Sequence, residues 1–183
     1  MAEPGTDGYV VITGGPGAGK STLIDALAAK GFARTDEAGR AIIQDRLAIG
    51  ATGWSDPELF AELMLSWELR SHRQAAGSRG PVFFDRGVPD LVGYFRLIGR
   101  PLPAHVHEAA LRFRYHRVVF AAPPWREIYV HDAERTQSWE EAVRTHDAVT
   151  WAYTEHGYEV VALPPVPVAD RVAFVLDALG CGA

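Results

Sequence analysis

The sequence is poor in cysteine and in lysine, and both shortages are informative. Cys181 is the only cysteine in 183 residues. One cysteine cannot form an internal disulfide or a zinc site built on several cysteines, so we expect a protein of the reducing cytoplasm. Lysine and arginine together number 18, and only Lys20 and Lys30 are lysines. A GC-rich genome that favours arginine codons accounts for this bias, and a lysine inside a glycine-rich loop stands out against it.

The sequence also lacks long apolar runs and an excess of positive charge. No segment approaches the roughly 18 consecutive apolar residues that a membrane span needs, and the N-terminal residues lack the basic and apolar stretches of a signal peptide. The formal net charge is −5, so we expect no nucleic-acid partner. No repeat or linker divides the chain, and its length predicts a single domain over residues 1–183. No heptad repeat or exposed apolar run indicates an oligomeric interface, so the oligomeric state stays open.

Short apolar runs alternate with helical patterns along the whole chain. This alternation predicts an α/β fold with a parallel sheet covered by helices on both faces. Ligands of such sheets gather at the carboxyl ends of the strands. The predicted strands are 9–13, 32–35, 81–85, 118–121 and 158–163. Helices are predicted after the first glycine-rich loop to about 30, over 37–49, from 56, twice within 88–114, from 138, and over 168–179.

Three of the predicted helices carry a periodic apolar face that we expect to point inward. On the helix that opens at Ser138 this face includes Trp139, Ala142, Val143 and Tyr153. On the helix that begins at Asp56-Pro57 this face consists of Leu59, Phe60, Leu63, Met64 and Trp67. On the last helix it consists of Val168, Val172, Val175, Leu176 and Leu179.

Residues 14–21, Gly-Gly-Pro-Gly-Ala-Gly-Lys-Ser, match the phosphate-loop pattern G-x-x-x-x-G-K-[ST]. The match follows a predicted strand and precedes a predicted helix, which is the context that it requires. Glycines let backbone N–H groups turn toward a phosphate, and the helix N-terminus adds a positive dipole. Lys20 is expected to reach the β- and γ-phosphates of ATP, and Ser21 to bind Mg²⁺. The expected nucleotide-binding residues are Gly15, Gly17, Ala18, Gly19, Lys20, Ser21 and Thr22.

Acidic residues follow the second predicted strand, where the chain leaves the sheet beside this loop. Asp36 or Glu37 could accept a proton from an attacking hydroxyl or water. Arg40 lies three residues after Glu37, so on a helix it could orient Glu37 or hold an anionic substrate. The alternative is a helix N-terminus that favours acids because of its dipole, followed by a surface arginine. A D-x-x-G match at 36–39 does not indicate a GTPase, because the chain has no N-K-x-D motif.

An acid and an arginine end the third predicted strand. Asp85, after a buried apolar run, occupies the place where phosphate-loop proteins hold Mg²⁺ through water, and Arg86 could neutralise a transferred phosphoryl group. The alternative, which is compatible, is that Asp85 caps the next helix and pairs with Arg86. After the fourth strand, Arg126 and Arg135 are candidates for a lid that closes over phosphates. The alternative for this segment is a solvated loop in which nearby acids pair with both arginines.

Five segments together give the chain a resemblance to a known group. They are GGPGAGKST at 14–22, TDEAGR at 35–40, FFDRG at 83–87, PPWRE at 123–127 and LPPVPVADRV at 163–172. On these segments the chain resembles the P-loop kinases of the nucleoside- and nucleotide-kinase superfamily. It looks most like small bacterial AAA-domain "predicted ATPase" proteins related to nicotinamide-ribonucleoside kinases.

The resemblance implies a three-layer P-loop NTPase sandwich, with a five-stranded parallel sheet flanked by helices and a small arginine-bearing lid. It also implies that Glu37 or Asp36 is the base, that Asp85 and Arg86 serve metal and substrate, and that Arg126 and Arg135 belong to the lid. The loop at 163–166 would lie against adenine. Asp85-Arg86-Gly87 differs from the Glu-Arg-Ser of deoxynucleoside kinases, so the resemblance does not name the acceptor.

These observations lead to one hypothesis and two alternatives. We expect an ATP- and Mg²⁺-dependent phosphotransferase acting on a small-molecule hydroxyl acceptor, with Glu37, Arg40 and Arg86 binding that acceptor. The first alternative is an NTPase whose acceptor is water. The second is a nucleotide-dependent switch or binding module that acts through a partner.

Overall fold

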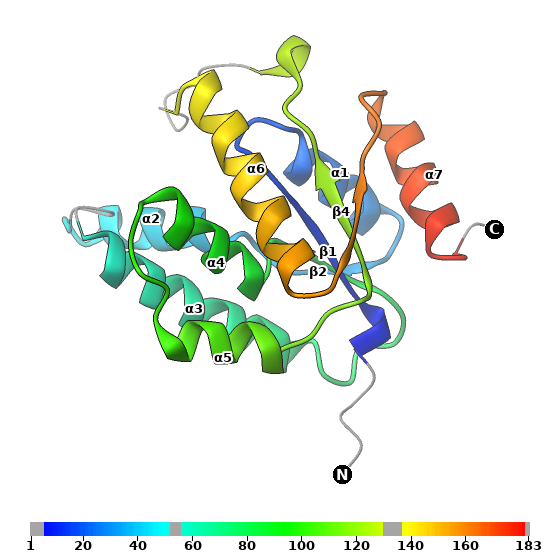
Figure 1. Ribbon diagram of the computed structural model, residues 1–183. Coiled ribbons are helices and arrows are strands. Elements are labelled where there is room, and N and C mark those ends of the chain that lie inside the picture. Colours follow the sequence, from blue (N-terminus) through cyan, green and yellow to red (C-terminus); the bar gives the residue numbers. More distant parts are fainter. Residues whose placement is uncertain (1–5, 52–55, 130–136, 182–183) are drawn as a thin grey trace.

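The computed structural model describes residues 6–51, 56–129 and 137–181, and its centre is a five-stranded sheet (Figure 1). The strand order is β2-β3-β1-β4-β5, and every neighbouring pair is parallel. All five predicted strands are therefore present in the predicted orientation. Their bounds are β1 Tyr9–Gly14, β2 Ala33–Arg34, β3 Val82–Asp85, β4 Val118–Ala122 and β5 Glu159–Ala162.

Seven α-helices lie within the described ranges. Two of them begin at the capping signals that the sequence contains. Asp56 accepts hydrogen bonds from the backbone N–H groups of Glu58 and Leu59, and Ser138 and Glu141 form a capping box. The bounds are α1 Lys20–Ala29, α2 Ala38–Ala48, α3 Pro57–Gln74, α4 Val88–Leu97, α5 Ala104–Arg112, α6 Trp139–Glu155 and α7 Val168–Ala178. Short 3₁₀ helices cover Thr6–Gly8 and Arg126–Ile128.

The helices form two layers, one on each face of the sheet. Alternate strand residues point to opposite faces, so Val11 and Phe84 pack against α3, α4, α5 and α6, whereas Ile12 and Phe83 pack against α1 and α7. Figure 1 shows α3, α4 and α5 gathered together, with α7 on the far side of β4 and β5. The two cores confirm the predicted three-layer arrangement. They also fix the carboxyl ends of β1 and β3 next to each other.

The predicted helix faces are wrong at two positions. Leu59 is 45% exposed and Val168 is 37% exposed. Both lie near the N-terminus of their helix, and the buried stripe of α3 instead runs from Phe60 and Ala61 through Leu65 to Glu68. None of the helices that the structure describes is long and apolar enough to cross a membrane.

Candidate active site

The loop between β1 and α1 has the geometry of a phosphate-binding loop. β1 is buried along its whole length and ends at Gly14, so the loop starts from a fixed point in the core. Gly19 caps α1 with a left-handed φ of 77°, a conformation that residues with a Cβ rarely adopt. Lys20 is the first residue of α1 and is buried, and its Nζ donates a hydrogen bond to the carbonyl oxygen of Gly15 at 2.8 Å. The structure thus folds the only buried lysine that it describes back over the loop.

Gly15 is required for a different reason, which is close packing. A Cβ at this position would lie 2.3 Å from the carbonyl oxygen of Ala142 in α6. A backbone carbonyl at that distance cannot move aside as the end of a flexible side chain could. The phosphate loop is therefore held against α6 as well as against the sheet.

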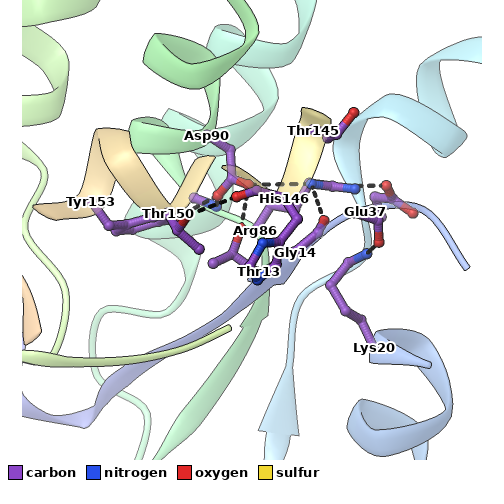
Figure 2. Close-up of polar contacts among 12 residues, drawn as sticks. Thr13, Gly14, Lys20, Glu37, Arg86, Asp90, Thr145, His146, Thr150 and Tyr153 are labelled. Atoms are coloured by element: carbon purple, nitrogen blue, oxygen red, sulfur yellow. Dashed lines mark hydrogen bonds and ion pairs between the residues drawn. The ribbon is translucent and has the colours of Figure 1, made fainter. Parts of the chain in front are cut away.

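Arg86 is at the centre of the site (Figure 2). Its Nε donates to Glu37 Oε1 at 3.0 Å, and its Nη1 donates to the Gly14 carbonyl at 3.0 Å and to Asp90 Oδ1 at 3.2 Å. Among the described residues, Arg86 is the only non-glycine with a positive φ, 73°. Such a conformation costs on the order of 1–2 kcal/mol, and strain of this kind is typical of functional sites.

Asp90, on α4, fixes Arg86 from the other side. Its carboxylate accepts hydrogen bonds from Thr13 Oγ1 at 2.5 Å, from Tyr153 Oη at 2.6 Å and from the backbone N–H of Gly87 at 3.0 Å. Asp90, Thr13 and Tyr153 are all buried. Asp90 is not among the site residues expected from the sequence, although its position four residues after Arg86, in a predicted helix, is a signal that points to it.

The charges around Arg86 keep Glu37 ionised. Burial alone would raise the pKa of Glu37, but the positive charges of Arg86 and Lys20 outweigh burial and lower the pKa from 4.5 to about 2. Burial likewise opposes the charge on Arg86, whereas the carboxylates of Glu37, Asp90 and Asp85 raise its pKa. Both partners are therefore charged at neutral pH. Glu37 lies at the N-cap of α2, where the helix dipole also favours a carboxylate.

At Lys20 and Asp85, burial outweighs the neighbouring opposite charges and disfavours the charged form. Burial, and then the positive charge of Arg86, lowers the pKa of Lys20 from 10.5 to about 8. Burial, and then the negative charge of Glu37, raises the pKa of Asp85 from 3.8 to about 6. Each group thus carries its charge at some cost. An anionic ligand beside Lys20 and a cationic ligand beside Asp85 would each offset that cost.

Ser21 and Asp85 fit the ligand chemistry of Mg²⁺. Ser21 Oγ donates to Asp85 Oδ2 at 3.4 Å, and Asp85 Oδ1 is buried without a hydrogen-bond partner within the described structure. Mg²⁺ takes oxygen ligands and commonly keeps waters and substrate phosphates beside one or two protein groups. The described residues contain no cluster of three or more histidine, cysteine or acidic side chains that could hold a metal by themselves. A hydroxyl and one carboxylate therefore suit a metal that arrives with a nucleotide.

A cavity of about 630 Å³ extends from the phosphate loop to α3 and α4. At one end it is lined by residues 16–22, and Glu37, Arg40 and Arg86 line its middle. Arg40 is exposed to solvent there. The lining residues contributed by α2, α3 and α4 are mostly apolar and include Ile43, Leu47, Phe60, Met64, Tyr94 and Leu97. The cavity is thus large enough for a nucleotide tail and a second molecule to share it.

The structure separates Asp36 from the other candidates. Asp36 lies at a different pocket, and its Oδ1 forms an ion pair with Arg34 Nη1 at 3.1 Å. Arg126 lies in the exposed 3₁₀ helix after β4, with its guanidinium 4.8 Å from the ring centre of Trp139. Arg135 lies outside the described residues. Of the two candidate bases, only Glu37 points into the cavity beside the phosphate loop.

Comparisons with known proteins agree with this geometry. A family model described as AAA domain matches residues 9–171. No curated protein matches the sequence significantly. A structure of deoxyadenosine kinase from M. mycoides with dCMP and dCDP superposes with a TM-score of 0.68 at 13% identity, covering 94% of this chain and 98% of the kinase.

Two further solved structures have the same fold. A NadR protein in complex with NR gives a TM-score of 0.68 at 19% identity and covers 95% of this chain, which spans 50% of the NadR chain. Thymidylate kinase from Candida albicans gives a TM-score of 0.65 at 10% identity, covering 96% of this chain and 92% of the kinase. The predicted P-loop kinase fold is therefore confirmed.

Proposed function

The chain belongs to this AAA domain family, and on that premise we propose that it transfers the γ-phosphoryl group of ATP to a hydroxyl of a small molecule. One observation carries the proposal. Arg86 joins Glu37, the candidate base, to the end of the strand that leads into the phosphate loop. A nucleotide on the loop and a hydroxyl beside Glu37 would meet next to the same guanidinium.

The phosphate loop would hold the donor. The N–H groups at the start of α1 and the Lys20 ammonium would bind the β- and γ-phosphates, and the phosphates would replace the Gly15 carbonyl as the partner of Nζ. Ser21 would bind Mg²⁺ directly and Asp85 would hold its water ligands, and this metal supplies positive charge that neutralises the phosphate oxygens. The proposed cofactors are thus ATP and Mg²⁺.

Glu37 and Arg86 would position the acceptor. A carboxylate with a pKa of about 2 is a weak base, but phosphoryl transfer proceeds through a loose transition state in which the attacking hydroxyl needs orientation more than early deprotonation. Glu37 would accept a hydrogen bond from that hydroxyl and take its proton as the new P–O bond forms, while the bond between the γ-phosphorus and the bridging oxygen breaks and ADP leaves. Arg86 would stabilise the negative charge on the moving group, and Arg126 would add charge from outside. Arg40 would hold the exposed side of the acceptor, and Arg135 is proposed as a second lid residue.

The shape of the cavity favours a second substrate over water. An NTPase needs only room for one water beside the γ-phosphate, whereas this cavity holds about 630 Å³ and has apolar lining residues from α2, α3 and α4. The test is to incubate the protein with ATP, Mg²⁺ and a metabolite pool, and to search by mass spectrometry for compounds that gain a phosphate. We expect at least one phosphorylated product, and none with Lys20→Ala. ATP consumption at the same rate with and without the pool, and without such a product, would contradict the proposal.

A further inference from the structure

Helix α3 presents an unusual residue to the cavity. Phe60, Met64 and Glu68 are spaced four residues apart, lie on one face of the helix and all line the cavity. Phe60 is 9% exposed and Glu68 is 4% exposed. The stripe therefore begins with two apolar side chains and ends with a buried acid.

Glu68 has no partner that explains its burial. Within the described part of the chain, no group donates a hydrogen bond to its carboxyl and no cation pairs with it. Asp90, which lines the same cavity, accepts hydrogen bonds from four groups. Burying a polar group without a hydrogen bond is costly, so a purely structural acid should have a partner as Asp90 does. The Glu68 oxygens are not among the fully buried unpartnered atoms of the described residues, which fits a carboxyl that faces the cavity.

The surroundings of Glu68 also oppose its negative charge. Burial, followed by the negative charges of Asp90 and Asp85, raises the pKa of Glu68 well above 4.5, and Arg86 offsets this only in part. The protonated form of the carboxyl is therefore favoured over the charged form, compared with a carboxyl in water. A neutral carboxyl can donate one hydrogen bond and accept another. Glu68 also lines the same cavity as Glu37 and Arg86.

We propose that Glu68 selects the acceptor by hydrogen bonding to a neutral polar group that sits beside the hydroxyl to be phosphorylated. The proposal rests on the proposed function and names the class of acceptor. The acceptor is uncharged at this end, carries at least one N–H or O–H donor besides the reacting hydroxyl, and has a flat or ring-shaped apolar part that packs on Phe60 and Met64. An anionic group beside Glu68 is disfavoured, because it would meet the negative charges of Asp90 and Asp85, which act on Glu68 itself.

The test compares Glu68→Leu and Glu68→Gln with wild type. The probes are the common ribo- and deoxyribonucleosides, which are neutral ring compounds with several donors, and their 5′-monophosphates as anionic counterparts. Binding is measured by thermal shift in the presence of ADP and Mg²⁺. At least one nucleoside should stabilise the wild type more than its monophosphate does. Its affinity should fall about tenfold or more in Glu68→Leu and by less in Glu68→Gln, which keeps a neutral donor and acceptor.

A second measurement separates this role from a structural one. Replacing an unpartnered buried acid by leucine should raise the melting temperature of the empty protein, because an apolar side chain suits the site better. A lower melting temperature in Glu68→Leu, or nucleoside binding that is equal in wild type and Glu68→Leu, would overturn the proposal. So would a panel in which monophosphates alone bind the wild type, or in which no compound binds.

Two controls keep the inference separate from the proposed function. Glu62→Gln changes an exposed acid of the same helix that pairs with His105, and it should leave nucleoside binding unchanged. Calorimetry with ATP and Mg²⁺ should give the same affinity for wild type and both Glu68 variants. If the wild type did not bind ATP, the proposed function would be wrong. If it bound ATP but the Glu68 variants bound nucleosides as the wild type does, only the inference would be wrong.

Discussion

Arg86 Nε lies 3.0 Å from Glu37 Oε1, although the two residues are 49 positions apart. The contact, drawn in Figure 2, ties the end of β3 to the start of α2. Both side chains are largely buried, with 18% and 23% of their surface exposed. Truncating one partner of such a pair leaves the other charge unpaired in a partly desolvated site, which is costly. The pair is therefore expected to contribute both to the stability of the fold and to the proposed reaction.

Arg86→Lys should lower ATP turnover by about 100-fold or more. Lysine keeps the positive charge but cannot reach Glu37, Gly14 and Asp90 at once, because it lacks the planar fork of the guanidinium. The measurement is single-turnover consumption of ATP. Arg112→Lys is the control, since Arg112 forms only an exposed pair with Glu108 on α5. Equal loss in both variants would show that the effect is not specific to the site.

Glu37 should make the folded state sensitive to acid. Its pKa is lowered in the folded protein, from 4.5 to about 2, so its contribution to the free energy of unfolding is present above 4.5 and is lost as the pH falls toward 2. The shift corresponds to at most about 3 kcal/mol. We expect wild type to be more stable than Glu37→Gln at neutral pH, and the difference to shrink below about pH 4.5. Denaturant unfolding at several pH values measures it, and a difference that is constant with pH would contradict the assignment.

Tyr153→Phe should destabilise the fold by about 1–3 kcal/mol. The fully buried hydroxyl donates to Asp90 Oδ2 at 2.6 Å, and its removal leaves Asp90 short of one donor. Tyr94→Phe is the matched control, because the Tyr94 hydroxyl bonds to no residue that the structure describes. Urea unfolding should place the Tyr94 variant within about 0.5 kcal/mol of wild type. Similar losses in the two variants would argue against the Asp90 network.

Gly15→Ala should destabilise the protein by about 2 kcal/mol or more, because α6 must move away from the new methyl group. Gly39→Ala is the contrast. A Cβ at Gly39 would lie 3.7 Å from Met64 Sδ and Phe60 Cζ, which is ordinary contact, and alanine favours the helix. Thermal unfolding should therefore show a loss for the first variant and no loss for the second. The reverse order would mean that the loop does not pack on α6 as described.

Much of this architecture was predictable from the sequence because it depends on local signals. Buried parallel strands read as continuous apolar runs, and the phosphate-loop pattern fixes a strand, a turn and a helix within a few residues. The positions of Lys20, Glu37 and Arg86 at the carboxyl ends of strands followed from the same patterns. Asp56 and Ser138 marked the starts of two helices correctly.

The remaining features depend on contacts between distant segments. Nothing local to Asp90 indicates that Thr13 and Tyr153 will donate to it, because they come from β1 and α6. The sequence does not distinguish Asp36 from Glu37 either. The two acids are neighbours, and only the folded backbone determines which side chain points into the cavity. Helical spacing places Glu68 on the same face of α3 as Phe60 and Met64. That it lines the cavity without a hydrogen-bond partner among the described residues follows only from the packing of α3.

The central claim is that residues 14–21 bind a nucleoside triphosphate with Mg²⁺, and the two lysines of the chain provide its most direct test. Calorimetry with ATP and Mg²⁺ should be run on wild type, Lys20→Ala and Lys30→Ala. Lys20 is buried against the loop, whereas Lys30 is exposed beyond the end of α1. We predict saturable binding to wild type and Lys30→Ala, and a loss of affinity of about 100-fold or more in Lys20→Ala. No heat of binding in the wild type, or equal binding by all three proteins, would contradict the account.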